Sequence, residues 1–140
     1  MPEQTRETPV TQPAKPCPFC NPSPQRIVID GVAAMALWDS YPLNPGHVLI
    51  VARRHVASWF ELTSVERVEM LRLADDARRV VIEKHHPDGF NLGLNDGAAA
   101  GQTVPHVHLH LIPRYRGDIP DPRGGVRWII PERARYWHKP

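Results

Sequence analysis

Three histidines alternate with apolar residues in the segment GQTVPHVHLHLIPR, which spans residues 101–114. An imidazole can bind a metal ion, act as a nucleophile or move a proton near neutral pH. A half-exposed strand with incidental histidines accounts for one of them but poorly for three. His106, His108 and His110 therefore mark a candidate site for metal binding, for acid–base chemistry or for nucleophilic catalysis.

The alternate spacing limits the metal hypothesis if the segment is a β-strand. Side chains at every second position share one face of a strand and lie about 7 Å apart. Because Zn–N bonds are about 2 Å long, two neighbouring histidines can share one ion, but three positions spanning about 13 Å cannot. At least one of the three histidines must have a different role.

A loop of small residues, NDGAAAGQTV, leads directly into the histidines (residues 95–104). Backbone N–H groups in such a loop can surround an anion, and the Gln102 amide and Thr103 hydroxyl add two donors. A glycine-rich loop alone is weak evidence. Its position beside the histidines predicts a phosphate next to a nucleophile or a general acid–base group.

The two cysteines of the chain, Cys17 and Cys20, form a C-x-x-C pair in the segment CPFC. Such a pair supplies half of a tetrahedral zinc site and leaves the other two ligands to histidine or carboxylate. A redox pair of the thioredoxin type would follow a strand and begin a helix, whereas this pair is followed by the turn-rich NPSP. The sequence favours zinc over redox chemistry or unused thiols.

The elements that must position these residues follow from periodicity. β-Branched and apolar runs predict strands at 26–30, 33–38, 47–52, 90–94 and 103–113. Thr63, with Glu66 three residues later, predicts the start of a helix over 63–85, which His86-Pro87-Asp88-Gly89 ends. The expected fold is α+β: an antiparallel sheet of about five strands covered by one main helix.

In the histidine strand, Val107, Leu109 and Leu111 would pack under this helix, and the imidazoles would line the opposite face. The 140 residues fit one domain, expected over 17–140, with an irregular tail from about residue 115. Residues 1–16 have few apolar side chains and are predicted to be disordered.

Composition narrows the setting of the protein. The formal net charge of +2 does not favour a nucleic-acid-binding protein. No segment is long and apolar enough to be a membrane span or a signal peptide. With only a C-x-x-C pair of cysteines, we expect a reducing, cytoplasmic location.

GQTVPHVHLHLIPR resembles the signature of the histidine triad (HIT) family, in which three histidines alternate with apolar residues. PGHVLI at 45–50, LNDGAAAGQTV at 94–104 and GD at 117–118 extend the similarity to residues 17–118. Together they resemble the fragile histidine triad branch, whose members hydrolyse dinucleoside polyphosphates. The resemblance implies a homodimer that pairs through the helix and a sheet edge.

The resemblance also implies roles for single residues. His108 would attack the α-phosphorus of a nucleotide to form a nucleotidyl-histidine, and His110 would assist proton transfer at the leaving oxygen. Asn95, Gly101, Gln102 and Thr103 would lie against phosphate, Asp39 would bind ribose, and His47 would support the site. Leu37 and Trp38 are expected near the base.

The resemblance to zinc-containing members completes the metal site. It places His55 and His106 beside Cys17 and Cys20 as ligands of a structural Zn²⁺. His106 would then face zinc, while His108 and His110 face phosphate. Two alternatives to dinucleoside polyphosphate hydrolysis remain: a nucleoside phosphoramidase, and a binding module that holds nucleotides without turnover. The three intact triad histidines argue against the second.

Overall fold

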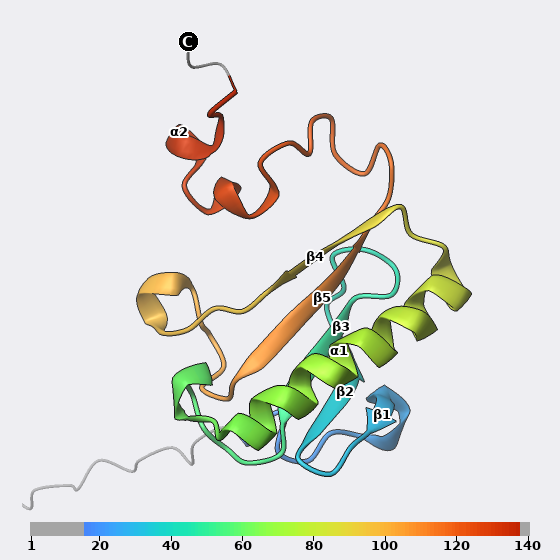
Figure 1. Ribbon diagram of the computed structural model, residues 1–140, viewed down its shortest axis with the longest axis vertical. Coiled ribbons are helices and arrows are strands. Elements are labelled where there is room, and N and C mark those ends of the chain that lie inside the picture. The colour runs from blue at the N-terminus through green and yellow to red at the C-terminus, as the bar shows by residue number, and fades with distance from the viewer. Residues whose placement is uncertain (1–15, 138–140) are drawn as a thin grey trace, which may run out of the picture.

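The computed structural model describes residues 16–137 and shows one antiparallel sheet covered by a helix (Figure 1). Its strands and helices are β1 (Ile27–Asp30), β2 (Ala34–Trp38), β3 (Val48–Ala52), α1 (Ser64–His85), β4 (Gly89–Gly93), β5 (His108–Arg114) and α2 (Pro131–Ala134). The strand order is β1-β2-β3-β5-β4, and every neighbouring pair is antiparallel. The predicted α+β class with five strands and one main helix is confirmed.

The helix α1 begins where the capping residues predict. The Thr63 hydroxyl accepts a hydrogen bond from the Glu66 N–H, and the Glu66 carboxylate accepts one from the Thr63 N–H. This reciprocal pair satisfies two N–H groups that the first turn leaves unpaired. The helix ends at His85, and the residue that caps it, His86, is left-handed with a φ of 52° and precedes Pro87.

Two apolar clusters lie on opposite faces of the sheet. On one face Met70, Leu73 and Val81 of α1 pack over Leu109 and Leu111, with Val107 beside them. The opposite face carries a smaller cluster of buried side chains: Phe19, Met35, Leu37, Leu49 and Val51. Because strand side chains alternate, His108 and His110 share this second face, as predicted.

The histidine strand is shorter than predicted at its beginning. Residues 103–107 lie outside β5, whose first ladder pair joins His108 to Val51. Pro105 has no N–H to donate, and the Val107 N–H bonds to the Val56 carbonyl instead of to β3. His106 therefore precedes the strand, and only His108 and His110 belong to it.

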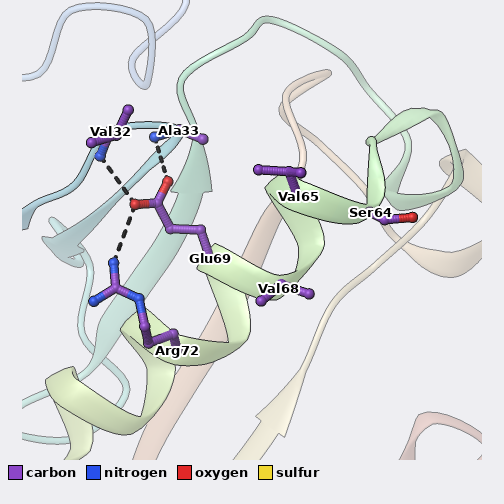
Figure 2. A pocket seen from close by; sticks show the side chains of 7 residues that line it. All are labelled: Val32, Ala33, Ser64, Val65, Val68, Glu69 and Arg72. Atoms are coloured by element: carbon purple, nitrogen blue, oxygen red, sulfur yellow. Dashed lines mark hydrogen bonds and ion pairs between the residues drawn. The ribbon is translucent and has the colours of Figure 1, made fainter.

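A turn of α1 holds the β1–β2 hairpin through Glu69. Its carboxylate accepts hydrogen bonds from the N–H groups of Val32 and Ala33 and pairs with Arg72 (Figure 2). A surface cavity of about 420 Å³ lies between Val32 of the hairpin and Val65 and Val68 of the helix. None of its lining residues belongs to the histidine or cysteine groups.

Beyond Arg114 the described chain contains only short helices, a 3-10 helix over Gly125–Ile129 and the single turn α2. Three arginines here stack on aromatic rings, with Arg123 over Trp137, Arg127 over Tyr136 and Arg135 over Trp128. Across residues 16–137, no helix combines the length and the hydrophobicity that crossing a membrane requires. Except for Pro16, the tail predicted to be disordered lies outside the described residues.

Candidate functional site

Four potential metal ligands meet where three distant segments converge. Cys17 and Cys20 come from the segment before β1, His55 from the loop after β3, and His106 from the segment before β5. Their ligand atoms all lie within 4.8 Å of one another. The structure thus brings together the four residues that the family resemblance implies as zinc ligands.

The distances within this cluster suit a tetrahedral ion. The Nδ1 atoms of His55 and His106 are 3.2 Å apart, and Cys17 Sγ lies 3.4 Å from His106 Nδ1. Cys20 Sγ lies 3.2 Å from His55 Nδ1 and 3.7 Å from His106 Nδ1. Zn–N and Zn–S bonds of about 2.0 and 2.3 Å require tetrahedral edges of roughly 3.3 to 3.7 Å. The donor set therefore fits Zn²⁺.

The orientation of His106 supports this reading. Its ring is completely buried, and its Nε2–H donates to the Ala52 carbonyl at 2.6 Å. This bond leaves the lone pair on Nδ1, the nitrogen that faces the sulfurs. Burial lowers the pKa of His106, and this favours the neutral ring that a metal requires.

The next histidine of the triad uses the opposite nitrogen. The Nδ1–H of His108 donates to the His106 carbonyl at 2.8 Å. A neutral imidazole carries a proton on only one of its two nitrogens, so the free lone pair of His108 lies on Nε2. His108 is 8% exposed, so this lone pair belongs to an imidazole that is largely excluded from water. It can act as a nucleophile.

The third histidine belongs to a chain of polar groups that starts at Asp39. The Leu43 N–H donates to His47 Nδ1, so the proton of His47 lies on Nε2. The His47 Nε2 atom, which carries this proton, lies 2.9 Å from His110 Nδ1 and 3.3 Å from an Asp39 carboxylate oxygen. His110 accepts at Nδ1 and therefore carries its own proton on Nε2. It is a hydrogen-bond donor beside the His108 ring, whose centroid is 5.1 Å away.

Burial is the main reason why the pKa values of His110 and His47 are lowered. Burial, together with repulsion from His108 and His47, lowers the pKa of His110 to about 4. Burial also lowers the pKa of His47, although the Asp39 carboxylate opposes this effect. Both rings are neutral near pH 7, and an anion bound beside His110 would raise its pKa toward the charged form.

Asp39, His47 and His110 also lie close enough to hold a metal ion. The tautomers make this assignment unfavourable, since the Leu43 N–H occupies Nδ1 of His47 and keeps the proton on the nitrogen that would have to bind the ion. The geometry instead gives a hydrogen-bonded chain that fixes the proton of His110. The three triad histidines thus have different surroundings. His106 lies in the metal cluster, His110 is hydrogen-bonded to His47, and His108 lies between them in the sequence.

The loop before the triad is held by its own hydrogen bonds. Gln102 accepts from the Gly97 N–H, and its amide donates to the carbonyls of Ala57 and Val104. Val104 also accepts from the His106 N–H, so Gln102 links the loop to the triad. A direct contact from the Gln102 side chain to phosphate would require these bonds to break.

The other predicted loop residues are exposed. Gly101 has a φ of 91°, which glycine adopts without strain, and its N–H donates to Ala98. The Asn95 amide and Thr103 hydroxyl have no hydrogen-bond partner within residues 16–137. These two side chains are the ones that a phosphate could engage without disrupting the loop.

Sequence reasoning missed two residues that make contacts around these groups. Asp96 accepts hydrogen bonds from the Ser58 hydroxyl and the Trp59 N–H, and so joins the loop to the segment after His55. Phe19 packs against the rings of His106 and His108. The signal for Phe19 was an aromatic residue inside CPFC, whereas nothing in the sequence marked Asp96.

The two residues expected near the base, Leu37 and Trp38, face opposite sides of the sheet. Leu37 belongs to the apolar cluster on the histidine face, but Trp38 packs on the α1 side against Lys84 and His85. Strand alternation places consecutive residues on opposite faces, so the two cannot line the same side. The expectation that Trp38 lies near the base stays a prediction.

The amino-acid sequence of this chain matches a known protein family over most of its length. The model of the HIT domain family matches residues 21–117. The chain is 39% identical over 93 residues to an AP-4-A phosphorylase of Mycobacterium tuberculosis, covering 66% of this chain and 48% of that protein. It is 40% identical over 86 residues to a bis(5'-adenosyl)-triphosphatase of Dictyostelium discoideum, covering 61% and 58%. The chain thus spans about half the length of these relatives.

Solved structures show the same similarity. The crystal structure of a zinc-bound histidine triad family protein from Mycobacterium smegmatis superposes with a TM-score of 0.66 at 30% identity, covering 76% of this chain and 84% of that one. A HIT family protein from Bacillus subtilis gives a TM-score of 0.67 at 28% identity, covering 74% and 77%. The Cys₂His₂ cluster of the present chain therefore occurs in a fold that holds zinc in a relative.

Proposed function

Because the chain belongs to the histidine triad (HIT) family, we propose that it hydrolyses dinucleoside polyphosphates through a nucleotidyl-histidine intermediate. Similarity to the phosphorylase and triphosphatase supports this substrate class. The observation that carries the proposal is the pair of opposite tautomers, in which His108 presents a lone pair at Nε2 and His110 presents a proton at Nε2. A nucleophile thus lies beside a donor.

The proposed reaction has two steps. First, His108 Nε2 attacks the α-phosphorus, a phosphorus–nitrogen bond forms, and the bond to the bridging oxygen breaks. His110 hydrogen-bonds to this oxygen, and the bound phosphates raise the pKa of its ring, so that its proton can stabilise the leaving group. Water then hydrolyses the intermediate, which frees the nucleotide and restores His108.

The remaining residues act around this centre. Asn95 and Thr103 bind phosphate oxygens, Gly101 and Gln102 shape the loop that presents them, and Asp39 reaches the ribose. Cys17, Cys20, His55 and His106 would hold a zinc ion that crosslinks the chain beside the nucleophile. The metal has no part in the phosphoryl chemistry.

Replacing the nucleophile tests the reaction. His108→Ala should lower kcat by more than about 10³-fold, because the substitution removes the imidazole nitrogen that attacks the phosphorus. Nucleotide binding, measured by calorimetry with adenosine monophosphate, should remain. Rapid quenching of wild-type protein with a radiolabelled substrate should trap label on His108. An active His108→Ala variant or label on another residue would refute the assignment.

The substrate class is tested separately by comparing kcat/KM for diadenosine tri- and tetraphosphate, adenosine phosphoramidate and adenylyl-lysine. The proposal expects the diadenosine polyphosphates to have the highest values. Preference for the phosphoramidate or adenylyl-lysine would identify a nucleoside phosphoramidase. Tight binding without turnover of any of the four would identify a binding module.

A further inference from the structure

A buried phenylalanine links the two halves of the triad. Phe19 lies between Cys17 and Cys20 in the sequence and is 5% exposed. Its ring centroid is 5.0 Å from that of His108 and 5.8 Å from that of His106. The CPFC segment that contributes both cysteines therefore also packs an aromatic ring against the candidate nucleophile, His108.

Hydrogen bonding alone does not fix the position of the His108 ring. Its one hydrogen bond in the described structure joins Nδ1 to the His106 carbonyl, and that bond fixes the tautomer. The bond restrains one edge of the ring, whereas Nε2, the reacting atom, lies on the other side. No hydrogen bond within residues 16–137 restrains that side, so packing must limit rotation of the ring, and the aromatic rings packed on His108 are those of Phe19 and His110, with centroids 5.0 and 5.1 Å away.

Small displacements of a nucleophile have large kinetic effects. A misplacement of about 1 Å can lower a rate by about 10²-fold, because attack requires a nearly correct approach. Removing the aromatic ring of Phe19 would leave space beside His108, and the imidazole could then rotate and displace Nε2. Substrate binding depends on other groups and would change little.

We propose that Phe19 is a positioning residue for His108, so that the CPFC element sets the geometry of the nucleophile as well as that of the metal cluster. Its kinetic consequence rests on the proposed function. Its structural consequence, a confined His108 ring, does not. The two can therefore be measured separately.

Met35 provides the matched control. It lies in the same apolar cluster as Phe19 and is similarly buried at 4% exposed, but in the strand register Val51 lies between Met35 and His108. A variant at this position reports what loosening the cluster does by itself. Phe19→Leu and Phe19→Met keep an apolar side chain at residue 19, so failure of one to fold leaves the other.

The kinetic arm uses zinc-loaded proteins whose metal content has been matched. For diadenosine tetraphosphate, we expect Phe19→Leu and Phe19→Met to lower kcat by about 10- to 100-fold with KM changed by less than about twofold. Met35→Leu should keep wild-type kcat. An equal loss of kcat in Met35→Leu, or a Phe19 effect confined to KM, would overturn the positioning role.

The second arm needs no turnover. Diethyl pyrocarbonate acylates accessible imidazole nitrogens, and site-resolved mass spectrometry gives the rate at His108. We expect labelling to be several-fold faster in the Phe19 variants than in wild type and in Met35→Leu. Unchanged labelling would refute the confinement. Faster labelling in a protein whose wild type hydrolyses none of the substrates would uphold the confinement and refute the proposed function instead.

Discussion

At the scale of single residues, the three triad histidines differ in which ring nitrogen is free. His106 donates through Nε2 and leaves Nδ1 for a metal, whereas His108 donates through Nδ1 and leaves Nε2 for a substrate. His110 accepts at Nδ1 from His47 and keeps a proton on Nε2. The three side chains are chemically identical, and the hydrogen-bond partner of each ring determines which of its nitrogens is free and therefore which role it can have.

The lowered pKa of His110 predicts a pH-dependent loss of stability. Its pKa is about 4 in the folded protein and 6.5 ordinarily, so the unfolded chain takes up the proton first as the pH falls. The stabilisation is complete above pH 6.5 and is lost between pH 6.5 and 4. Between pH 7 and pH 5, wild type should lose about 2 kcal/mol more unfolding free energy than His110→Asn.

Urea unfolding of the two metal-loaded proteins at both pH values measures this difference. The remaining histidines and the metal cluster are common to both proteins, so their titration largely cancels. Equal losses of unfolding free energy would show that His110 titrates near its ordinary value.

At the scale of elements, the first turn of α1 is tied to the loop that carries a metal ligand. Glu66 caps the helix through Thr63 and also pairs with Arg54, the neighbour of His55. Hydrogen bonds from Arg54 and the Thr63 backbone lower the pKa of Glu66 to about 2. The start of the helix thus helps to position His55.

Removing this carboxylate should destabilise the protein. We expect Glu66→Ala to lower the unfolding free energy by about 2 kcal/mol, because the capping bond and the pairing with Arg54 are lost together. Arg79→Ala, which removes an exposed ion pair with Asp76 on the same helix, should change it by less than about 0.5 kcal/mol. Urea denaturation of both variants tests the contrast, which fails if the two losses are equal.

At the scale of the whole molecule, the cysteine–histidine cluster joins parts of the chain that are far apart in sequence. Cys17 and His106 are separated by 89 residues, and Cys20 and His55 by 35. An ion held by these groups closes long loops and stabilises only the folded state. A homodimer and a cytoplasmic location stay predictions.

Metal removal should therefore weaken the entire fold. We expect about one zinc per chain by elemental analysis, and a melting temperature that falls by several degrees when a chelator is added. Cys17→Ser should have little zinc and should not respond to the chelator. A metal-free wild-type protein whose melting temperature is insensitive to chelation would exclude the structural zinc.

Local patterns were enough to predict much of the fold. Thr63 and Glu66 located the helix start because a capping box involves only neighbouring residues. The alternation of Leu109 and Leu111 with His108 and His110 assigned the two faces, because a strand has a period of two. The same alternation places Leu37 and Trp38 on opposite faces of the sheet.

What the sequence by itself determined is the chemistry available: two thiols, three alternating histidines and a glycine-rich loop, with a family resemblance that paired His55 and His106 with the cysteines. Only the tertiary structure decided the start of β5, the engagement of Gln102 by Ala57, and the packing of Phe19 against His108. Each depends on a partner outside its own segment, and local propensity carries no information about such partners.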